Sequence, residues 1–407
     1  MKIGSELELL LEKDGKPLEW KDWPGLLEAT RQISSRKTHP KTDILTGELL
    51  GLEIPGIGVI SCDSSASQGE LAAEPKEGKR ELLSTLRQLY DLLEDAVKSI
   101  GGTIRWGAQY PGQIREEDYW KRVARKGVYT IARKEWGWKH YEMHLSAAFQ
   151  PAIDIDPANV ASYLNAIYAA SPLSIVWFGG SAPSRGNADE QYYEYRMHGW
   201  YRMLPNNPSE LNILGVRKFS DADDYLKALL GLRARSVSLE GDYKSGQVAY
   251  FDPNVTGRDV VSGAKAHRIT EVVDFRKDEI RTADVDVSGR ELMNQMDWWT
   301  FWDARWRFKK NKSGGFDKSY IEVRNMGTPS SYDKLEQMLD FFIELRKAHD
   351  EVNALAEKYA VWKNIDEART EAIRYGRLPQ NHRDFLESLR NGNIITGNKL
   401  HGSKQRV

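Results

Sequence analysis

The sequence predicts an α+β fold built around a mainly antiparallel sheet. Several segments alternate apolar and polar residues, as antiparallel strands with one covered face do, and helical segments separate them along the chain. No GxGxxG or GxxxxGK[ST] pattern occurs, so we do not expect a dinucleotide-binding or P-loop fold. Hydrophobic residues make up 40% of the 407 residues, which is enough for a large core.

In the N-terminal half, residues 3–11 (IGSELELLL) alternate as a strand does. Residues 79–100 carry apolar side chains at helical spacing, and the glycine pair that follows them is a natural helix end. We expect a further strand at 141–149 (YEMHLSAAF) and a helix opened by Asp156–Pro157. The apolar run 174–180 fits either the end of that helical element or a buried strand.

In the C-terminal half, aromatic residues gather at 297–306 (DWWTFWDARW). They indicate either an aromatic seam of the core or a wall around a planar ligand. Residues 320–327 (YIEVRNMG) alternate as a strand does, and 330–359 has the pattern of one long amphipathic helix. Shorter helices are expected at 365–375 and 380–390.

The charge balance and the single cysteine limit the function classes. The chain has 58 basic and 59 acidic residues, whereas a general nucleic-acid binder usually has a basic excess. The lone Cys62 cannot form an internal disulfide. No stretch approaches about 18 uninterrupted apolar residues, and the first residues are acidic where a signal peptide needs an apolar run. We therefore expect a cytoplasmic protein that does not cross a membrane.

Three of the expected strands place charged or imidazole side chains on one face, because residues i and i+2 of a strand point the same way. The pairs are Glu6 with Glu8, Glu142 with His144, and Glu322 with Arg324. The plain interpretation is the wet face of a half-exposed sheet. Glu and His, in place of the Thr and Lys usual on such faces, favour a functional face.

This face has the chemistry of a nucleotide site. Clustered carboxylates repel each other and are tolerated when divalent cations lie among them. Oxygen ligands with one imidazole suit Mg²⁺ or Mn²⁺, while a neighbouring arginine suits a phosphate. Carboxylates, a hard metal ion and arginine on one sheet face together point to the phosphates of a nucleotide.

Six ordered segments within residues 1–345 resemble the glutamate–cysteine ligase family of carboxylate–amine ligases. They are IGSELE, QGELAAEPKEG, GGTIRWGAQYPG, HLSAAF, SPLSIVWFGGSAPSRG with the following YYEYR, and FWDARWRF with YIEVRNMGTP. The most specific match is the WDxR segment that ends at Arg305, followed by the EVR of the 320–327 strand. Trp306 stands where the family usually has a proline, and 306–319 is interpreted as a long basic loop. These departures leave the acid and amine substrates open.

The resemblance implies a glutamine-synthetase-like fold, in which a curved antiparallel sheet with helices on its outer face forms a catalytic funnel for ATP and metal ions. It also implies an ATP-dependent ligase that phosphorylates a carboxylate and lets an amine displace the phosphate. The family's best-known reaction joins the γ-carboxylate of glutamate to cysteine, so the expected partners are a small carboxylic acid and an amine such as an amino acid or a peptide. Residues 1–345 would be the catalytic domain, and 346–407 a helical extension with a basic tail, suited to oligomerisation or to a partner.

The carboxylates are the expected metal ligands, on strand face and resemblance together. The candidates are Glu6, Glu8, Glu322, Glu70, Glu74 and Asp63. His144 is expected to be a metal ligand or a phosphate contact, and the alternative is a structural histidine. Glu142 beside it either joins the site or faces solvent.

The arginines are expected to bind anions. Arg324 is assigned to the phosphates of ATP. Arg305 and Arg196 are candidates for phosphate or for the α-carboxylate of a substrate, with a surface ion pair as the alternative for each. The expected catalytic residues are therefore Glu322, Arg324 and Arg305.

Two other functions stay open. A catalytically silent protein with this fold would only bind a nucleotide or a partner. A metal-dependent hydrolase would use His140 and His144, which are spaced i, i+4, although the segment alternates as a strand and lacks the HExxH order. The basic run 305–312 would either attract an acidic or phosphorylated substrate or form a solvated loop.

Overall fold

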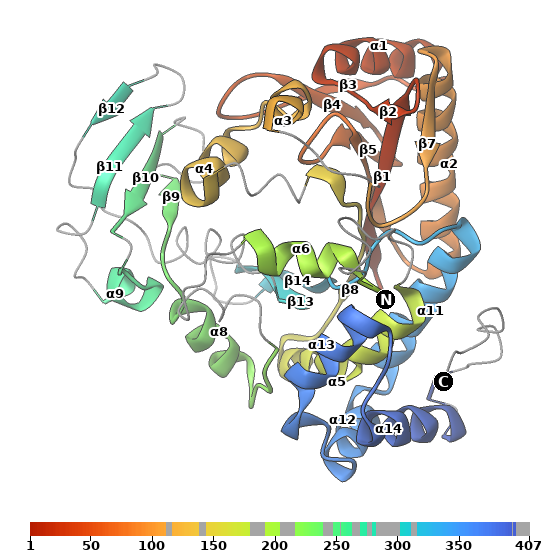
Figure 1. Ribbon diagram of the computed structural model, residues 1–407, viewed down its shortest axis with the longest axis vertical. Coiled ribbons are helices and arrows are strands. Elements are labelled where there is room, and N and C mark those ends of the chain that lie inside the picture. The colour runs from red at the N-terminus through yellow and green to blue at the C-terminus, as the bar shows by residue number, and fades with distance from the viewer. Residues whose placement is uncertain are drawn as a thin grey trace.

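The computed structural model has a large antiparallel sheet at its centre (Figure 1). It describes residues 1–110, 116–137, 144–179, 192–203, 216–238, 247–252, 254–262, 269–274, 279–281, 302–310, 316–392 and 394–395. The order of the main strands is β13-β14-β8-β1-β6-β5-β4-β3, with β2 and β7 also paired to β1. The strands are β1 (Ile3–Lys13), β2 (Lys16–Pro17), β3 (His39–Thr42), β4 (Leu49–Ile54), β5 (Gly58–Cys62), β6 (Gln68–Lys76), β7 (Gly102–Arg105), β8 (Phe149–Asp154), β13 (Ala304–Lys310) and β14 (Phe316–Val323). The predicted α+β class with a mainly antiparallel sheet is confirmed.

A second, four-stranded antiparallel sheet lies apart from the first (Figure 1). Its strands are β9 (Ser236–Ser238), β10 (Gln247–Phe251), β11 (Ile269–Asp274) and β12 (Glu279–Arg281), in the order β12-β11-β10-β9. The described α-helices are α1 (Trp23–Ile33), α2 (Lys79–Ser99), α3 (Glu116–Arg122), α4 (Gly127–Trp136), α5 (Val160–Phe178), α6 (Tyr195–Met203), α8 (Ala222–Leu230), α9 (Gly257–Val261), α11 (Tyr332–Lys347), α12 (His349–Lys358), α13 (Ile365–Tyr375) and α14 (Gln380–Asn391). Short 3₁₀ turns are η1 (Trp20–Asp22), η3 (Pro157–Asn159) and η5 (Val361–Lys363).

One face of the large sheet is apolar and fully covered. Ile3, Ile153, Ile321 and Trp306 face each other across β1, β8, β14 and β13, and each is at most 1% exposed. On β6, Gly69 has no side chain, which lets Leu11 of β1 and Leu93 of α2 close over it. The alternation of apolar and polar residues in β1 and β14 thus separates a helix-covered face from a polar face.

Helices cover the apolar face in two groups. The amphipathic helix α2 packs on the β1–β6 half, with α1 beside it. The other half is covered by α5 and α11, and the hydroxyl of Tyr168 in α5 donates a 2.6 Å hydrogen bond to the carbonyl of Ala304 in β13. The opposite, polar face is therefore the one left for ligands.

Two sequence interpretations need correction, and a third segment follows one of the two alternatives left open for it. Of the strand expected at 141–149, the described part 144–148 is not a strand, because residues 145–148 bond to several segments, 108–110, Glu8 and 327–328, and form no continuous ladder; strand β8 begins at Phe149. Residues 141–143 lie outside the described residues. The apolar run 174–180 continues α5 to Phe178; this helix is buried on nearly all sides, so it has no polar stripe that would reveal its period. The interpretation of 306–319 as a loop is wrong at both ends, because residues 306–310 belong to β13 and residues 316–319 belong to β14, which pairs with it.

The C-terminal helices pack on the same core as the sheet. Residue 345 lies inside α11, and the helix expected at 330–359 is interrupted at Ala348, where the backbone leaves the helical region (φ −114°, ψ 24°). In α13, Arg369 is 1% exposed and forms a two-pronged ion pair with the fully buried Asp303, with N–O distances of 2.9 and 2.5 Å. Helices α13 and α14 lie where they were predicted.

The predicted aromatic segment is core where the structure describes it. Trp302 and Trp306 are buried and pack against Tyr225, so the core interpretation is confirmed for these two rings. Residues 297–301 and the tail 401–407 lie outside the described residues. None of the helices in the described ranges is long and apolar enough to cross a membrane.

Candidate functional site

A cavity of about 460 Å³ lies over the polar face of the large sheet. Strands β1, β3, β4, β6, β8 and β13 and helices α4 and α6 contribute to its walls. Among the described residues, its lining includes the acidic side chains Glu6, Glu8, Asp43, Asp63 and Glu70 and the basic side chains Lys41, Lys126, Arg196, Arg305, Arg307 and Arg324. Carboxylates and cations are thus concentrated in one place in a chain whose overall charge is close to zero.

The carboxylates come from neighbouring strands in register. Glu8 of β1 lies directly opposite Glu70 of β6, and Glu70 lies opposite Ser61 of β5. Glu6 precedes Glu8 by two residues on β1 and lies on the same face. Asp63 comes directly after the end of β5. We call Glu6, Glu8, Glu70 and Asp63 the carboxylate row.

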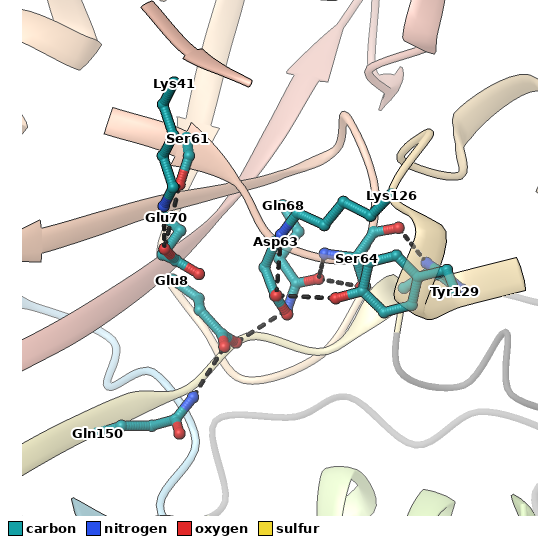
Figure 2. A network of polar contacts seen from close by, with 11 residues as sticks. Glu8, Lys41, Ser61, Asp63, Ser64, Gln68, Glu70, Lys126, Tyr129 and Gln150 are labelled. Carbon is teal, nitrogen blue, oxygen red and sulfur yellow. Dashed lines mark hydrogen bonds and ion pairs between the residues drawn. The ribbon is translucent and has the colours of Figure 1, made fainter. Parts of the chain in front are cut away.

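Glu8 is the most firmly held member of the row (Figure 2). Its Oε2 accepts hydrogen bonds from the side chain of Gln68 at 2.8 Å and from the backbone N–H of Ala148 at 2.7 Å. Its Oε1 accepts one from the side chain of Gln150 at 2.9 Å. These neutral donors fix the carboxylate in place without cancelling its charge.

Negative charge in the row is only partly compensated. Burial and the neighbouring Glu70, Glu322 and Glu8 raise the pKa of Glu6 to about 8. Burial and Asp63 likewise raise the pKa of Glu8 to about 8. Glu6 forms no hydrogen bond or ion pair with another described residue. The row is therefore an environment that favours bound protons or other cations.

Two lysines flank the row on the side away from β13. Burial would lower the pKa of Lys126, but Asp63, 3.5 Å from its ammonium, raises it above the ordinary value, so the group stays charged. Tyr129 of α4 donates a 2.8 Å hydrogen bond to the same Asp63 oxygen. Lys41 reaches from the edge strand β3 toward Glu70, and Figure 2 shows its side chain pointing along Ser61.

The opposite side of the cavity is an arginine cluster held by Glu322, formed by Arg305 and Arg307 of β13 and Arg324 beyond β14. The Glu322 carboxylate lies 2.7 Å from Arg305 Nη2, 3.7 Å from Arg307 Nε and 3.6 Å from Arg324 Nε. Burial would raise its pKa, but these guanidinium groups hold it below the ordinary value. Glu322 lies beneath the arginines and does not itself line the cavity.

Arg196 completes the cluster from α6. It is 5% exposed, donates a 2.9 Å hydrogen bond to the carbonyl of Arg324 and lies 4.5 Å from the centre of the Trp200 ring. The buried Glu194 carboxylate accepts the backbone N–H groups of Arg196 and Met197 and so caps the start of α6. This cap fixes the direction in which α6 presents Arg196.

The structure brings some of the expected residues together and separates others. Glu6, Glu8, Glu70, Asp63, Arg196, Arg305 and Arg324 line one cavity. Glu74 lies outside its lining, where it accepts the backbone N–H of Gly56 at 3.1 Å and pairs with Lys76. His140 and Glu142 lie outside the described residues.

His144 lies behind the cavity wall. It is 2% exposed, and its ring packs edge-on against Tyr119 and Tyr129. Its Nδ1 lies 2.5 Å from the carbonyl oxygen of Ser64, which can only accept, so Nδ1 carries the proton. In this position His144 supports the segment that leads to Asp63 and the wall residue Tyr129.

Sequence reasoning missed several lining residues. Arg307 stands in the basic run 305–312 but was not singled out, although it follows Arg305 by two residues in a segment where Trp306 and Phe308 alternate with the arginines. Nothing in the sequence indicated that Lys41 and Lys126 belong to the site, because each stands in a short polar stretch. Their relevance depends on strand pairing and helix packing that only the tertiary structure shows.

The donor set of the row fits a hard divalent cation such as Mg²⁺ or Mn²⁺. Glu6 forms no hydrogen bond or ion pair in the described part of the chain, and the other three carboxylates keep unused lone pairs. Within the described ranges, no three His, Cys, Asp or Glu side chains lie close enough together to hold a metal ion. An ion would therefore have to draw the carboxylates together, and it would relieve the repulsion that raises the pKa values of Glu6 and Glu8.

Comparisons with known proteins give only distant structural likenesses. No protein-family model matches the chain, and no curated protein matches it. The glutamate–cysteine ligase of Francisella tularensis, in complex with AMP, superimposes with a TM-score of 0.43 at 13% identity, covering 98% of this chain and 83% of that one. A bifunctional glutathione synthetase from Pasteurella multocida gives a TM-score of 0.41 at 10% identity, and the 98% of this chain that aligns spans about half (51%) of that protein. The function therefore has to be inferred from the site itself.

Proposed function

We propose that this protein is an ATP-dependent carboxylate–amine ligase that forms an amide through an acyl phosphate. The observation that carries the proposal is a single cavity in which a row of carboxylates faces a cluster of arginines. Transfer of a phosphoryl group needs positive charge around the phosphates and oxygen ligands for the ions that accompany them. This cavity offers both on the polar face of one sheet.

In the proposed site, the arginine cluster binds the phosphates of ATP. Guanidinium groups of Arg305, Arg307 and Arg324 match phosphate oxygens in charge and in fork geometry. Glu322 holds these groups at 2.7 to 3.7 Å and so orients them before a ligand arrives. Arg196, fixed by the cap on α6, adds a fourth cation.

Glu6, Glu8, Glu70 and Asp63 are the groups that would hold Mg²⁺ or Mn²⁺. When bound, such ions offset the charge of the phosphates and make the γ-phosphorus easier to attack. The chain's own contribution is to fix Glu8 through Gln68 and Gln150 and to keep Glu6 open toward the cavity.

The reaction then follows in two steps. A carboxylate oxygen of the acid substrate attacks the γ-phosphorus, and the bond from that phosphorus to the ADP oxygen breaks. A neutral amine attacks the carbonyl carbon of the acyl phosphate and loses a proton to the carboxylate row, and the bond from carbon to the phosphate oxygen breaks. Phosphate replaces hydroxide as the leaving group, which makes amide formation feasible. The acid substrates to be tested include glutamate, whose γ-carboxylate is the group that the resemblance indicates.

Of the two alternatives, the metal-dependent hydrolase has less support from the geometry. A metal-dependent hydrolase would need His144 at an accessible site, whereas its ring is buried between two tyrosines. A catalytically silent nucleotide-binding protein would use the same arginine cluster, so only turnover separates it from a ligase.

The test is phosphate release from ATP and Mg²⁺ in pools of amino acids and amines, with mass spectrometry of the products. We expect release that needs both an acid and an amine, and a product lighter by one water than their sum. ATP binding without release in any pool would favour the silent protein. No ATP binding would overturn the assignment of the arginine cluster.

Two variants on strand β6 provide a matched pair. Glu70→Gln removes a member of the carboxylate row and should lower phosphate release by about 100-fold or more. Glu74→Gln changes a carboxylate on the same strand that lies outside the cavity lining and should leave release near the wild-type rate. An equal loss of phosphate release in both variants would show that lining the cavity does not distinguish the carboxylates needed for the reaction from the others.

A further inference from the structure

The cavity has a second cationic end, separate from the arginine cluster. Lys41 and Lys126 lie on the side of the row formed by β3 and α4, and the aliphatic side chains Ile44, Leu45, Val128 and Ala132 line the same side. We call this side the lysine end. The order of charge across the sheet is therefore positive at the lysine end, negative along the row and positive again at the arginines.

The wall of the lysine end is firmly built. Asp43 Oδ1 accepts backbone N–H groups from Leu45 at 3.1 Å, Thr46 at 2.8 Å and Gly127 at 3.1 Å. Thr46 adds a 2.7 Å hydrogen bond to the carbonyl of Arg125. The turn after β3 is thus fastened to the start of α4. Gly127 permits this contact, because a Cβ there would lie 2.3 Å from the Leu45 side chain.

Lys41 is placed at this end by the pairing of three strands. Lys41, Gly51 and Ser61 lie opposite each other on β3, β4 and β5. Because Gly51 has no side chain, the long lysine side chain can pass over it toward Ser61 and Glu70. Any Cβ at Gly51 would lie 2.6 Å from the Ser61 Cβ, so this passage depends on the glycine.

The ammonium group of Lys41 is only loosely engaged. Its acceptors among the described residues are Ser61 Oγ at 3.4 Å and Glu70 Oε1 at 3.9 Å, both longer than an ordinary hydrogen bond. Its side chain is 42% exposed, whereas that of Lys126 is 14% exposed and lies beside Asp63. An ammonium has three N–H donors, so Lys41 can still bind an anionic ligand.

We propose that the lysine end binds the amine-bearing substrate, an amino acid with an aliphatic side chain, through its carboxylate. The carboxylate pairs with Lys41, and the aliphatic group packs on Ile44, Leu45 and Val128. The amine then lies toward the carboxylate row, where the acyl phosphate forms. This inference rests on the proposed ligase function and names the substrate class for one end of its cavity.

A carboxylate fits this end better than a second phosphate does. The ammonium of Lys41 lies near β6, which is four strands away from β13, or roughly 19 Å along the sheet at the usual strand spacing. Lys41 and the arginine cluster therefore lie at opposite ends of the cavity, with the carboxylate row between them. One loosely held ammonium beside aliphatic side chains matches a single anionic charge carried by an apolar molecule.

The experiment measures binding of L-valine and L-leucine to the full chain with Mg²⁺ and a non-hydrolysable ATP analogue, by calorimetry. Lys41→Met should weaken binding by about 10- to 100-fold, the usual effect of losing a charged hydrogen bond. Lys41→Arg should retain most of it. Lys37→Met, which alters an exposed lysine outside the cavity lining, is the control and should bind as the wild type does.

Valinamide and leucinamide test the carboxylate itself. Each should bind the wild type about 10- to 100-fold more weakly than its parent amino acid, and Lys41→Met should not weaken it further. Equal binding of the amino acids to wild type and Lys41→Met, or no binding to any variant, would overturn the inference while ATP binding and phosphate release persist. If the wild type neither binds the ATP analogue nor releases phosphate, the proposed function fails and this inference fails with it.

Discussion

Replacing Glu6 with glutamine should make the protein more stable at alkaline pH. Glu6 is a largely buried carboxylate whose pKa is raised from an ordinary 4.5 to about 8 by burial and by neighbouring carboxylates. Below pH 4.5 Glu6 is protonated in both the folded and the unfolded state, so the contribution of Glu6 to the free energy of unfolding is fully present. Between pH 4.5 and 8 the unfolded state releases the proton first, so the free energy of unfolding falls as pH rises. Glutamine cannot ionise and removes this loss.

The size of the effect follows from the pKa shift. Each pKa unit corresponds to about 1.4 kcal/mol, so the shift of Glu6 sets an upper limit of about 5 kcal/mol above pH 8. Glu6 is partly accessible and shares its repulsion with Glu8, and both reduce the gain from changing one residue. We therefore expect Glu6→Gln to raise the free energy of unfolding by about 2 kcal/mol near pH 9 relative to pH 5.

The assay is urea denaturation of wild type and variant from about pH 5 to pH 9, without and with Mg²⁺. The difference between the two proteins should grow with pH, and Mg²⁺ should reduce it by stabilising the wild type at high pH. The exposed Glu77, whose side chain is 63% accessible, provides the control variant Glu77→Gln. A difference that does not change with pH would refute the conclusion that negative charge in the row is only partly compensated.

Two further predictions concern the buried ion pair and the arginine cluster. Asp303→Asn leaves Arg369 buried without its counter-charge and should lower the free energy of unfolding by about 3–5 kcal/mol in urea denaturation. A loss below about 1 kcal/mol would mean that the pair does not tie α13 to the sheet. Glu322→Gln removes the charge that orients Arg305 and Arg324, and it should lower ATP-dependent phosphate release by about 100-fold or more while the circular dichroism spectrum stays unchanged. Normal turnover by this variant would rule out an orienting role for Glu322.

Local patterns in the sequence determined the elements whose periodicity is strong. The alternation in residues 3–11 predicted β1, and that in 320–327 predicted the end of β14, because apolar side chains there meet helices and polar ones do not; β14 ends at Val323, so the strand is shorter than predicted on that side. The spacing of leucines predicted α2, and the same reasoning located α13 and α14. The strand prediction failed where a segment bonds to several partners, as in residues 144–148, and the sequence left two alternatives open where a segment lacks contrast between its faces, as at the end of α5.

For the candidate site, the sequence determined which chemical groups stand on the polar face: Glu6 and Glu8 on β1, and Glu322 and Arg324 at β14. Only the tertiary structure decided their surroundings, because these depend on strand order and register. It placed Glu322 beneath three arginines and Glu74 outside the cavity lining. It also brought Lys41 across Gly51 to the end of the carboxylate row, a contact between residues far apart in sequence that no local pattern encodes.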